Sequence, residues 1–329
     1  MAYQPPFQLT HTMTRQVARI GELIGTWKAT HQNLLLPELR RGNRIKTIQA
    51  SLAVEQNTLS VEQVTAVLAG KTVLGQPREI QEVLNAFAAY EAMSHWQPHN
   101  LEDLLAAHGL LMRGLVDNAG HLRQSGTGIY QGTQLVHMAP PANQLPRLMD
   151  DLLTWLKTTD AHPLIASAAF HYDSEFIHPF SDGNGRMGRL WQTLILSDWQ
   201  PMLAYLPVET VIKHRQQAYY QLLGEADQNS DCSAFIEFLL AAIESSLEEA
   251  IASETETRVE MQVKTRVKTP DKILALLQQQ PELTLAEVAN HIGLSTSTVE
   301  RAVAKLKQQH KLSYHGPKKG GYWQVKITT

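Results

Sequence analysis

Cysteine is nearly absent from this sequence, because Cys232 is the only one among 329 residues. A single thiol can form neither an internal disulfide nor a thiolate metal cage, which favours a reducing compartment. No apolar run reaches the roughly 20 residues that a membrane span requires, and the N-terminal residues lack the basic-then-apolar pattern of a secretory signal. These absences predict a soluble, cytoplasmic protein that does not act in a membrane.

An excess of either charge is also lacking overall, since the net charge is only −3. The two signs are unevenly placed, however. Residues 264–329 hold eleven Lys and Arg and four Asp and Glu, a net charge of +7, which leaves −10 for the rest of the chain. An acidic body followed by a basic unit indicates two domains with different tasks.

Alternating strand patterns are scarce and no fixed-period repeat is present, whereas apolar residues recur at helical spacing over most of the chain. The pattern and its capping residues predict helices over residues 14–27, 60–70, 77–93, 100–115, 144–159, 163–180, 188–199, 214–227 and 232–251. Residues 121–141 are the exception. They are rich in Gly, Thr and Val and end in two prolines, which predicts an inserted β-hairpin. The expected fold class is therefore mainly α.

Gly183, Gly185 and Gly188 have the GxGxxG spacing of a dinucleotide-binding loop. That loop requires a hydrophobic strand before the first glycine and a parallel sheet around it. The preceding residues are instead predicted to be helical, and no parallel strand pattern occurs elsewhere. A dinucleotide-binding fold is excluded.

The same segment still suits a phosphate group. Glycines allow consecutive backbone N–H groups of residues 183–185 to form an anion-binding nest ahead of a helix N-terminus. Arg186 and Arg189 share one helix face, Asp182 is a natural Mg²⁺ ligand, and His178 can accept a proton. A lone histidine is more often structural, and two arginines at this spacing more often face solvent. Their occurrence together within twelve residues favours function.

Residues 178–189, HPFSDGNGRMGR, match the signature HPFx(D/E)GNGRxxR of Fic-domain proteins at every specified position. The resemblance extends over roughly residues 35–245. Fic proteins typically transfer AMP from ATP to a hydroxyl group of a target protein and release pyrophosphate. The resemblance thus implies a protein adenylyltransferase with a helical core and a β-hairpin flap.

Roles for individual residues follow from the resemblance. It implies His178 as the general base and Asp182 as the Mg²⁺ ligand, while Phe180 would anchor the loop in the core. The implied ATP site comprises Glu55, Leu135, Val136, His137, Met138, Gly183, Asn184, Gly185, Arg186, Met187, Gly188, Arg189 and Tyr219. Within that set, His137 can equally be a surface residue of the flap, and Tyr220 can replace Tyr219 at the pocket or both can belong to the core.

Residues 51–57, SLAVEQN, resemble the inhibitory motif (S/T)xxxE(G/N) that precedes the Fic core in one subgroup. Ser51 and Glu55 fit this motif, whereas Gln56 departs from the usual Gly or Asn. A carboxylate offered to Arg189 would compete with the γ-phosphate of ATP for the same guanidinium. The alternatives are that Glu55 is an ordinary solvent-facing residue, or that it positions a water molecule for removal of AMP.

The basic C-terminal unit resembles a winged helix, with Gly293 in the turn of a helix-turn-helix and a two-stranded wing after it. The start of its recognition helix would contact DNA through Ser295, Thr296, Ser297, Thr298 and Arg301, with Lys305, Lys318 and Lys319 on phosphates. Contact with a protein only is the alternative. The expected domains are residues 1–90 with the inhibitory motif, 91–250 as the Fic core, 251–268 as a linker or helix extension, and 269–329 as the winged helix.

Two classes of function remain open at this stage. The chain is either an autoinhibited enzyme that uses ATP and Mg²⁺, or chiefly a DNA-binding regulator with a Fic core of secondary importance. Within the first class, removal of AMP can replace its addition. The sequence identifies neither the target protein nor a DNA site, and it leaves open whether the helical core forms a homodimer.

Overall fold

The computed structural model describes residues 3–30, 37–131, 134–266, 269–317 and 320–326, and it leaves out the side chains of residues 30–39, 129–137 and 254–268. The chain divides into two compact units, Met1–Ile251 and Ala252–Thr329. The finer division expected from the sequence stays a prediction. Within the described residues, no helix is long and apolar enough to cross a membrane.

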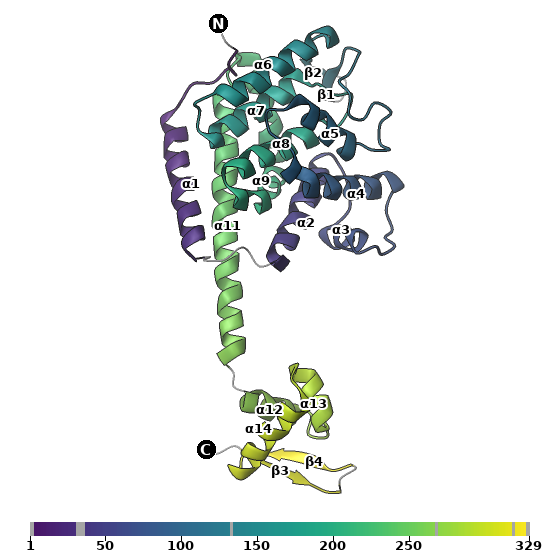
Figure 1. The fold of residues 1–329 in the computed structure, drawn as a ribbon, viewed down its shortest axis with the longest axis vertical. Coiled ribbons are helices and arrows are strands. Elements are labelled where there is room, and N and C mark those ends of the chain that lie inside the picture. The colour runs from purple at the N-terminus through teal and green to yellow at the C-terminus, as the bar shows by residue number, and fades with distance from the viewer. Residues whose placement is uncertain (1–2, 31–36, 132–133, 267–268, 318–319, 327–329) are drawn as a thin grey trace. The chain divides into compact units, whose positions relative to one another are not determined.

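The first unit is a helical assembly with one strand pair (Figure 1). Its elements are α1 (His11–Thr30), α2 (Pro37–Val54), α3 (Val61–Leu68), α4 (Pro77–Ala92), η1 (Met93–His95), α5 (Leu101–Leu111), β1 (Gly128–Gln131), β2 (Gln134–Met138), η2 (Ala142–Gln144), α6 (Leu145–Thr158), α7 (Pro163–Ile177), α8 (Asn184–Trp199), η3 (Pro201–Tyr205), α9 (Val208–His214), α10 (Gln216–Asn229) and α11 (Ser233–Arg266). The mainly α fold class is thus confirmed, and the backbone of residues 251–266 continues α11 as a helix.

Helices α7 and α8 pack against each other at the centre of this unit (Figure 1). Every residue of α7 from Leu164 to Ser174 is buried, and so is every residue of α8 from Arg186 to Leu196. Helices that are covered on all sides belong to the core of a domain. The loop that joins them, which contains His178, is therefore held at both ends by well-packed structure.

Local sequence signals explain many of the helix ends. Ser60 and Gln63 form a capping box at the start of α3, and Asn100 accepts hydrogen bonds from the N–H groups of Glu102 and Asp103 at the start of α5. A helix N-terminus leaves such groups unpaired unless a side chain accepts from them. The predicted cap at Asn100 is confirmed.

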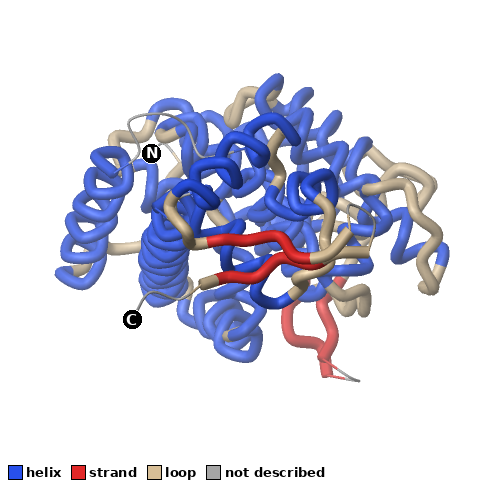
Figure 2. Tube along the Cα trace, turned by 90° about the horizontal axis from the view of Figure 1, so that it is seen from below, coloured by secondary structure: helices blue, strands red, loops and turns tan. Residues whose placement is uncertain are grey.

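The predicted hairpin within residues 121–141 is also present. Strands β1 and β2 are antiparallel, with Gly128 opposite Met138 and Gln131 opposite Gln134. Figure 2 shows the two strand pairs of the protein in red among helices and loops.

The second unit has the order of elements of a winged helix. It comprises α12 (Thr269–Gln279), α13 (Leu285–Ile292), α14 (Thr296–Gln308), β3 (Leu312–His315) and β4 (Tyr322–Val325). Its core includes Ile273, Val288, Val299 and Trp323. Gly293 ends α13 in the left-handed region with a φ of 68°, a conformation that glycine adopts without steric cost.

Candidate active site

His178 lies where α7 ends, in a conformation that is unusual for its residue type. Its φ of 51° and ψ of 59° are left-handed, and its N–H donates to the Ser174 carbonyl over 3.0 Å. A residue with a β-carbon pays about 1–2 kcal/mol for this conformation, and such residues concentrate at functional sites. The half-buried imidazole is thereby fixed at the entrance to the loop that follows.

The loop after His178 is braced from inside. The amide of Asn184 accepts from the N–H of Phe180 and donates to its carbonyl, both over 2.9 Å. The Phe180 ring, 1% exposed, stacks on His108 with 3.7 Å between ring centroids. His108 Nε2 in turn lies 3.0 Å from the carbonyl oxygen of Asp182. Phe180 therefore anchors the loop, and the side chain of Asn184 is used within it.

The hydrogen bonds of His108 fix its tautomer. Its Nδ1 accepts from the N–H of Gly120 over 2.9 Å, so Nε2 carries the hydrogen that bonds the Asp182 carbonyl. Burial lowers the pKa of His108 to about 4. The neutral ring is thus the form that supports the loop, a role that the sequence pattern did not predict.

Arg123 joins the loop to the base of the hairpin. Its guanidinium donates to the carbonyls of His178 (2.7 Å), Ser125 (2.7 Å) and Pro140 (2.6 Å). The residue is 3% exposed, and burial lowers its pKa. The sequence analysis did not identify Arg123. Its partners are backbone carbonyls, which every residue has, so no pattern of side chains in the sequence indicates them.

Helix α8 begins at Asn184, four residues before the expected start, so the expected nest of N–H groups in a loop over residues 183–185 is wrong in detail. Of the three glycines Gly183, Gly185 and Gly188, Gly183 alone has a positive φ, 84°, and a β-carbon on it would collide with Met112. Gly185 and Gly188 are helical, because close packing against neighbouring side chains outweighs the low helix propensity of glycine. The feature suited to an anion is therefore the first turn of α8, because a helix N-terminus leaves N–H groups without intrahelical partners and carries the positive end of the dipole.

The guanidinium of Arg189 is 1% exposed and is held by α2 and the residue just beyond it. Its Nε donates to Ser51 Oγ over 3.0 Å, and its Nη2 donates to the Ser51 carbonyl over 3.0 Å and to Glu55 Oε1 over 2.7 Å. A β-carbon on Gly185 would collide with the Glu55 carboxylate. Glu55 therefore covers the first turn of α8, instead of facing solvent away from the site.

A second group of charges surrounds Arg186 and Asp182. Arg186 contacts Glu82 Oε1 over 3.2 Å and Asp182 Oδ1 over 3.0 Å, and Arg78 contacts Asp182 Oδ2 over 3.1 Å. Glu82 also accepts a 2.9 Å hydrogen bond from the side chain of Asn57. Asp182, the predicted metal ligand, and Arg186, a predicted phosphate ligand, are thus paired with Arg78 and Glu82 of α4. The sequence analysis did not identify these two residues of α4.

The departure at Gln56 has a structural explanation. Helix α2 ends at Val54, Gln56 has a φ of 69°, and the N–H of Asn57 returns to the carbonyl of Leu52 over 3.1 Å. This is the left-handed helix ending for which Gly or Asn is the usual residue. Gln56 thus adopts the left-handed conformation that Gly or Asn usually adopts at this position. Its β-carbon makes this conformation sterically less favourable than it is for glycine.

Several predicted ATP ligands do not belong to the group of side chains around Arg186 and Arg189. Tyr219 is 1% exposed and its hydroxyl lies 2.9 Å from His171 Nε2, so it belongs to the core, whereas Tyr220 is 48% exposed. Met187 and Gly188 are buried where α8 faces α7. Met138 is exposed on β2, and the side chains of Leu135, Val136 and His137 lie outside the described residues.

Glu175 is a further acid that sequence reasoning missed. It follows one turn after His171 on α7, with 4.0 Å between its Oε1 and His171 Nε2. Its Oε1 is buried and has no hydrogen-bond partner among the described residues. Burial raises the pKa of Glu175 to about 7, against an attraction to Arg189 that lowers it.

In the second unit, the predicted DNA-contacting residues gather at the start of α14. Ser295, Thr296, Ser297 and Arg301 are exposed, while Thr298 is half-buried. Ser295 also caps the helix by accepting from the N–H of Thr298. Lys305 is exposed on the same helix, and Lys318 and Lys319 lie outside the described residues.

Comparisons with known proteins agree with this architecture. The Fic/DOC family profile matches residues 98–196, and a winged helix-turn-helix DNA-binding profile matches residues 271–311. Protein adenylyltransferase Fic of Aedes aegypti is 27% identical over 265 residues, which are 77% of this chain and 51% of that protein. The counterpart from Nematostella vectensis is 28% identical over 225 residues, 63% of this chain and 49% of that protein.

The chain thus spans about half the length of the curated relatives it matches. A much fuller match is the crystal structure of a Fic family protein from Desulfovibrio desulfuricans G20. It is 48% identical, covers 99% of both chains and superposes with a TM-score of 0.80. With the full signature at residues 178–189 and this coverage, the chain belongs to the Fic family.

Proposed function

We propose that this protein transfers AMP from ATP to a hydroxyl side chain of a target protein, and that Glu55 holds it in a state of low activity. The observation that carries the proposal is the engagement of Arg189 by Ser51 and Glu55 at the first turn of α8. A buried guanidinium at a helix N-terminus is suited to a phosphate. The names of the curated relatives support the same reaction.

ATP would bind with its phosphates against the first turn of α8, with Arg186 and Arg189 as bidentate ligands. Mg²⁺ on nucleotides takes one or two carboxylates and phosphate oxygens. Asp182 fits this requirement, since its side chain is 41% exposed and its oxygens are hard ligands. No group of three metal-binding side chains occurs within the described residues. A bound Mg²⁺ ion would offset phosphate charge.

In the reaction, His178 accepts the proton of the target hydroxyl, and the hydroxyl oxygen forms a bond to the α-phosphorus. The bond from that phosphorus to the bridging oxygen breaks, so pyrophosphate leaves with the bonding electrons. The N–H groups of α8 and the two arginines stabilise the charge that develops. The edge of β2 can pair with an extended target segment through backbone hydrogen bonds.

Inhibition follows from competition for Arg189. The Glu55 carboxylate takes the guanidinium that a γ-phosphate requires, so ATP binds in an unproductive position or not at all. Asp182 and Arg186 must likewise exchange their contacts with Arg78 and Glu82 for the nucleotide and its metal ion.

Labelled ATP provides the test. The full chain is incubated with α-labelled ATP and Mg²⁺ as the unaltered protein, as Glu55→Gly and as Glu55→Gly combined with His178→Ala. We expect strong labelling of protein only in Glu55→Gly, and its loss in the double variant. Labelling that persists without His178 would contradict the mechanism. A labelled target that loses AMP to the unaltered protein but not to Glu55→Gly would instead favour removal of AMP.

A second function, DNA binding, is favoured by the match of residues 271–311 to a DNA-binding profile. The exposed start of α14 would enter the major groove, and basic side chains would contact phosphates. A mobility shift of duplex DNA by the full chain should weaken steeply with salt and with Arg301→Ala. A shift unchanged by that substitution would argue against α14 as the reading helix.

A further inference from the structure

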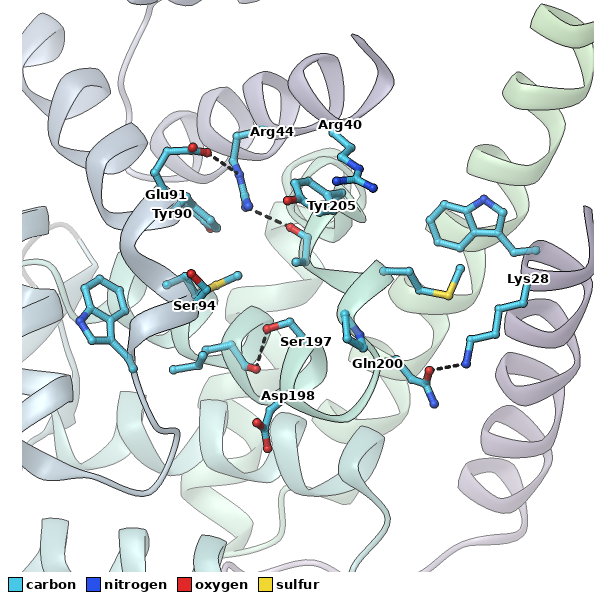
Figure 3. Close-up of a pocket in the computed structure, with 17 residues that line it drawn as sticks. Lys28, Arg40, Arg44, Tyr90, Glu91, Ser94, Ser197, Asp198, Gln200 and Tyr205 are labelled. Atoms are coloured by element: carbon cyan, nitrogen blue, oxygen red, sulfur yellow. Dashed lines mark hydrogen bonds and ion pairs between the residues drawn. The ribbon is translucent and has the colours of Figure 1, made fainter. Parts of the chain in front are cut away.

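A cavity of about 760 Å³ opens between α1, α2, α4, α8 and η3. Its described lining includes none of the residues of the candidate active site. Figure 3 shows Arg40 and Arg44 from α2 beside Tyr205, with Ser197 and Asp198 from α8 on the other side. A volume of this size is typical of sites for small molecules.

The two arginines are stacked on aromatic rings. Arg40 and Arg44 lie 5.4 and 4.9 Å from the centroid of the Tyr205 ring, and Arg44 lies 5.0 Å from that of Tyr90. Stacking fixes a planar guanidinium while leaving its edge available to an acceptor. The positions of both cations are thus set before any ligand enters.

Each arginine also has a buried donor that makes no hydrogen bond to the described residues. The Nε atoms of Arg40 and Arg44 are buried and have no hydrogen-bond partner among the described residues. Arg44 is 5% exposed; its Nη1 donates to the Ala204 carbonyl over 3.0 Å, and its Nε lies 3.8 Å from Glu91 Oε1, within ion-pair distance but too far for a hydrogen bond. Unpaired donors on buried cations are costly, and such groups call for an acceptor that arrives from outside.

We propose that this cavity binds a small organic anion. Its acidic group would accept hydrogen bonds from Arg40 and Arg44, and its apolar body would pack against Trp96 and Met202, which also line the cavity. Asp198 lies across the cavity from the arginines (Figure 3), and Glu91 lies beside Arg44, so among the side chains that the structure describes Arg40 has the less compensated charge. A carboxylate, sulfonate or phosphate on a ring-sized body meets these requirements.

The cavity shares two helices with the inhibitory contact. Helix α2 carries Arg40 and Arg44 and, further along, Ser51, about 10 Å from Arg44 at 1.5 Å per residue. Helix α8 begins at the anion-binding turn and ends at the cavity with Ser197 and Asp198. A ligand that bonds the two arginines of α2 and packs against Met202 of η3 binds best when α2 is in the position seen here, so it favours the Glu55–Arg189 contact. This second step rests on the proposed function, whereas binding does not.

Binding is tested with 8-anilinonaphthalene-1-sulfonate, an aromatic anion whose fluorescence rises on binding, and with neutral N-phenyl-1-naphthylamine as its matched control. The full chain should bind the sulfonate, and Arg40→Gln should weaken binding about tenfold or more. Ser94→Phe, at an exposed lining position, should weaken it with both arginines intact. Arg147→Gln, which removes an arginine 64% exposed on α6, should have no effect.

Equal affinities in the unaltered protein, Arg40→Gln and Ser94→Phe would overturn the site. Equally tight binding of the neutral analogue would overturn its preference for an anion. For the coupling, Glu55→Gly should bind the sulfonate about fivefold more weakly, because linkage is reciprocal. Unchanged affinity would refute the coupling. These binding measurements contain no ATP, so they do not depend on AMP transfer. A protein that binds the sulfonate as expected but never transfers AMP would contradict the proposed function and leave the binding site in place.

Discussion

Arg189 donates a 2.7 Å hydrogen bond from Nη2 to Oε1 of Glu55, a residue 134 positions earlier in the chain. The bond joins the central helix α8 to the segment just beyond α2, across the turn where phosphates would bind. A charge-assisted bond at a buried guanidinium is among the stronger polar contacts in proteins. The proposed inhibited state would therefore depend mainly on a contact that a phosphate can replace.

Ser51 should contribute a smaller share of this inhibition. Ser51→Ala removes the Oγ acceptor of Arg189 Nε but leaves the carbonyl acceptor and Glu55 in place. We expect labelling with ATP to rise, by less than in Glu55→Gly, because one buried donor then lacks its partner. Ser60→Ala, which removes the cap of α3 and does not touch Arg189, is the control. A rise equal to that of Glu55→Gly would show that Ser51 matters through the position of α2.

Glu82 should restrain the nucleotide site from its other side. Glu82→Gln weakens the ion pair with Arg186, which lies 3.2 Å away, and so frees Arg186 for phosphate. We expect a non-hydrolysable ATP analogue with Mg²⁺ to bind about fivefold more tightly, as measured by calorimetry. Glu62→Gln on the exposed side of α3 should leave affinity unchanged. Weaker binding in Glu82→Gln would show that the pair holds Arg186 in its productive position.

Gln56→Gly should stabilise the protein. The φ of 69° at Gln56 costs about 1 kcal/mol for a residue with a β-carbon, and glycine removes that cost. For a unit of this size we expect the melting temperature to rise by about 2–4 °C. The matched control is Gln221→Gly in the middle of α10, which should lower it by a similar amount. A lower melting temperature for Gln56→Gly would mean that the glutamine side chain makes a stabilising contact.

Glu175 makes a pH-dependent prediction. Burial raises its pKa from 4.5 to about 7, so between these values the folded protein holds a proton that the unfolded chain has lost. Stability conferred by the wild-type residue therefore falls as pH rises from 4.5 to 7. Glu175→Gln removes this loss, so the gain in the free energy of unfolding over the unaltered protein should be nearly absent at pH 4.5 and reach about 3 kcal/mol above pH 7.

Thermal unfolding of both proteins at pH 5 and pH 8 checks this expectation. Burial also raises the pKa of Asp173 to about 7, but Asp173 is present in both proteins and cancels from the difference. A difference in melting temperature that is the same at both pH values would show that Glu175 does not titrate in this window.

The sequence alone determined the chemistry that lies on consecutive residues. Residues 178–189 carry the proposed base, the proposed Mg²⁺ ligand and both arginines within twelve positions, so their joint presence needs no tertiary information. Amphipathic spacing likewise indicates the helices, because burial of one face imposes its period on the local sequence. The resemblance at Ser51 and Glu55 pointed to their contact with Arg189 for the same reason, since both motifs are short and continuous.

Only the tertiary structure decided which side chains surround that chemistry. Arg123, Glu82 and His108 act on the loop from 55, 104 and 74 residues away, and no local pattern encodes such pairings. Packing also decided that Tyr219 rather than Tyr220 is buried, and that α8 begins at Asn184 despite its glycines. Both outcomes depend on which neighbours a helix meets, and contacts between distant segments are fixed only when the whole core packs together.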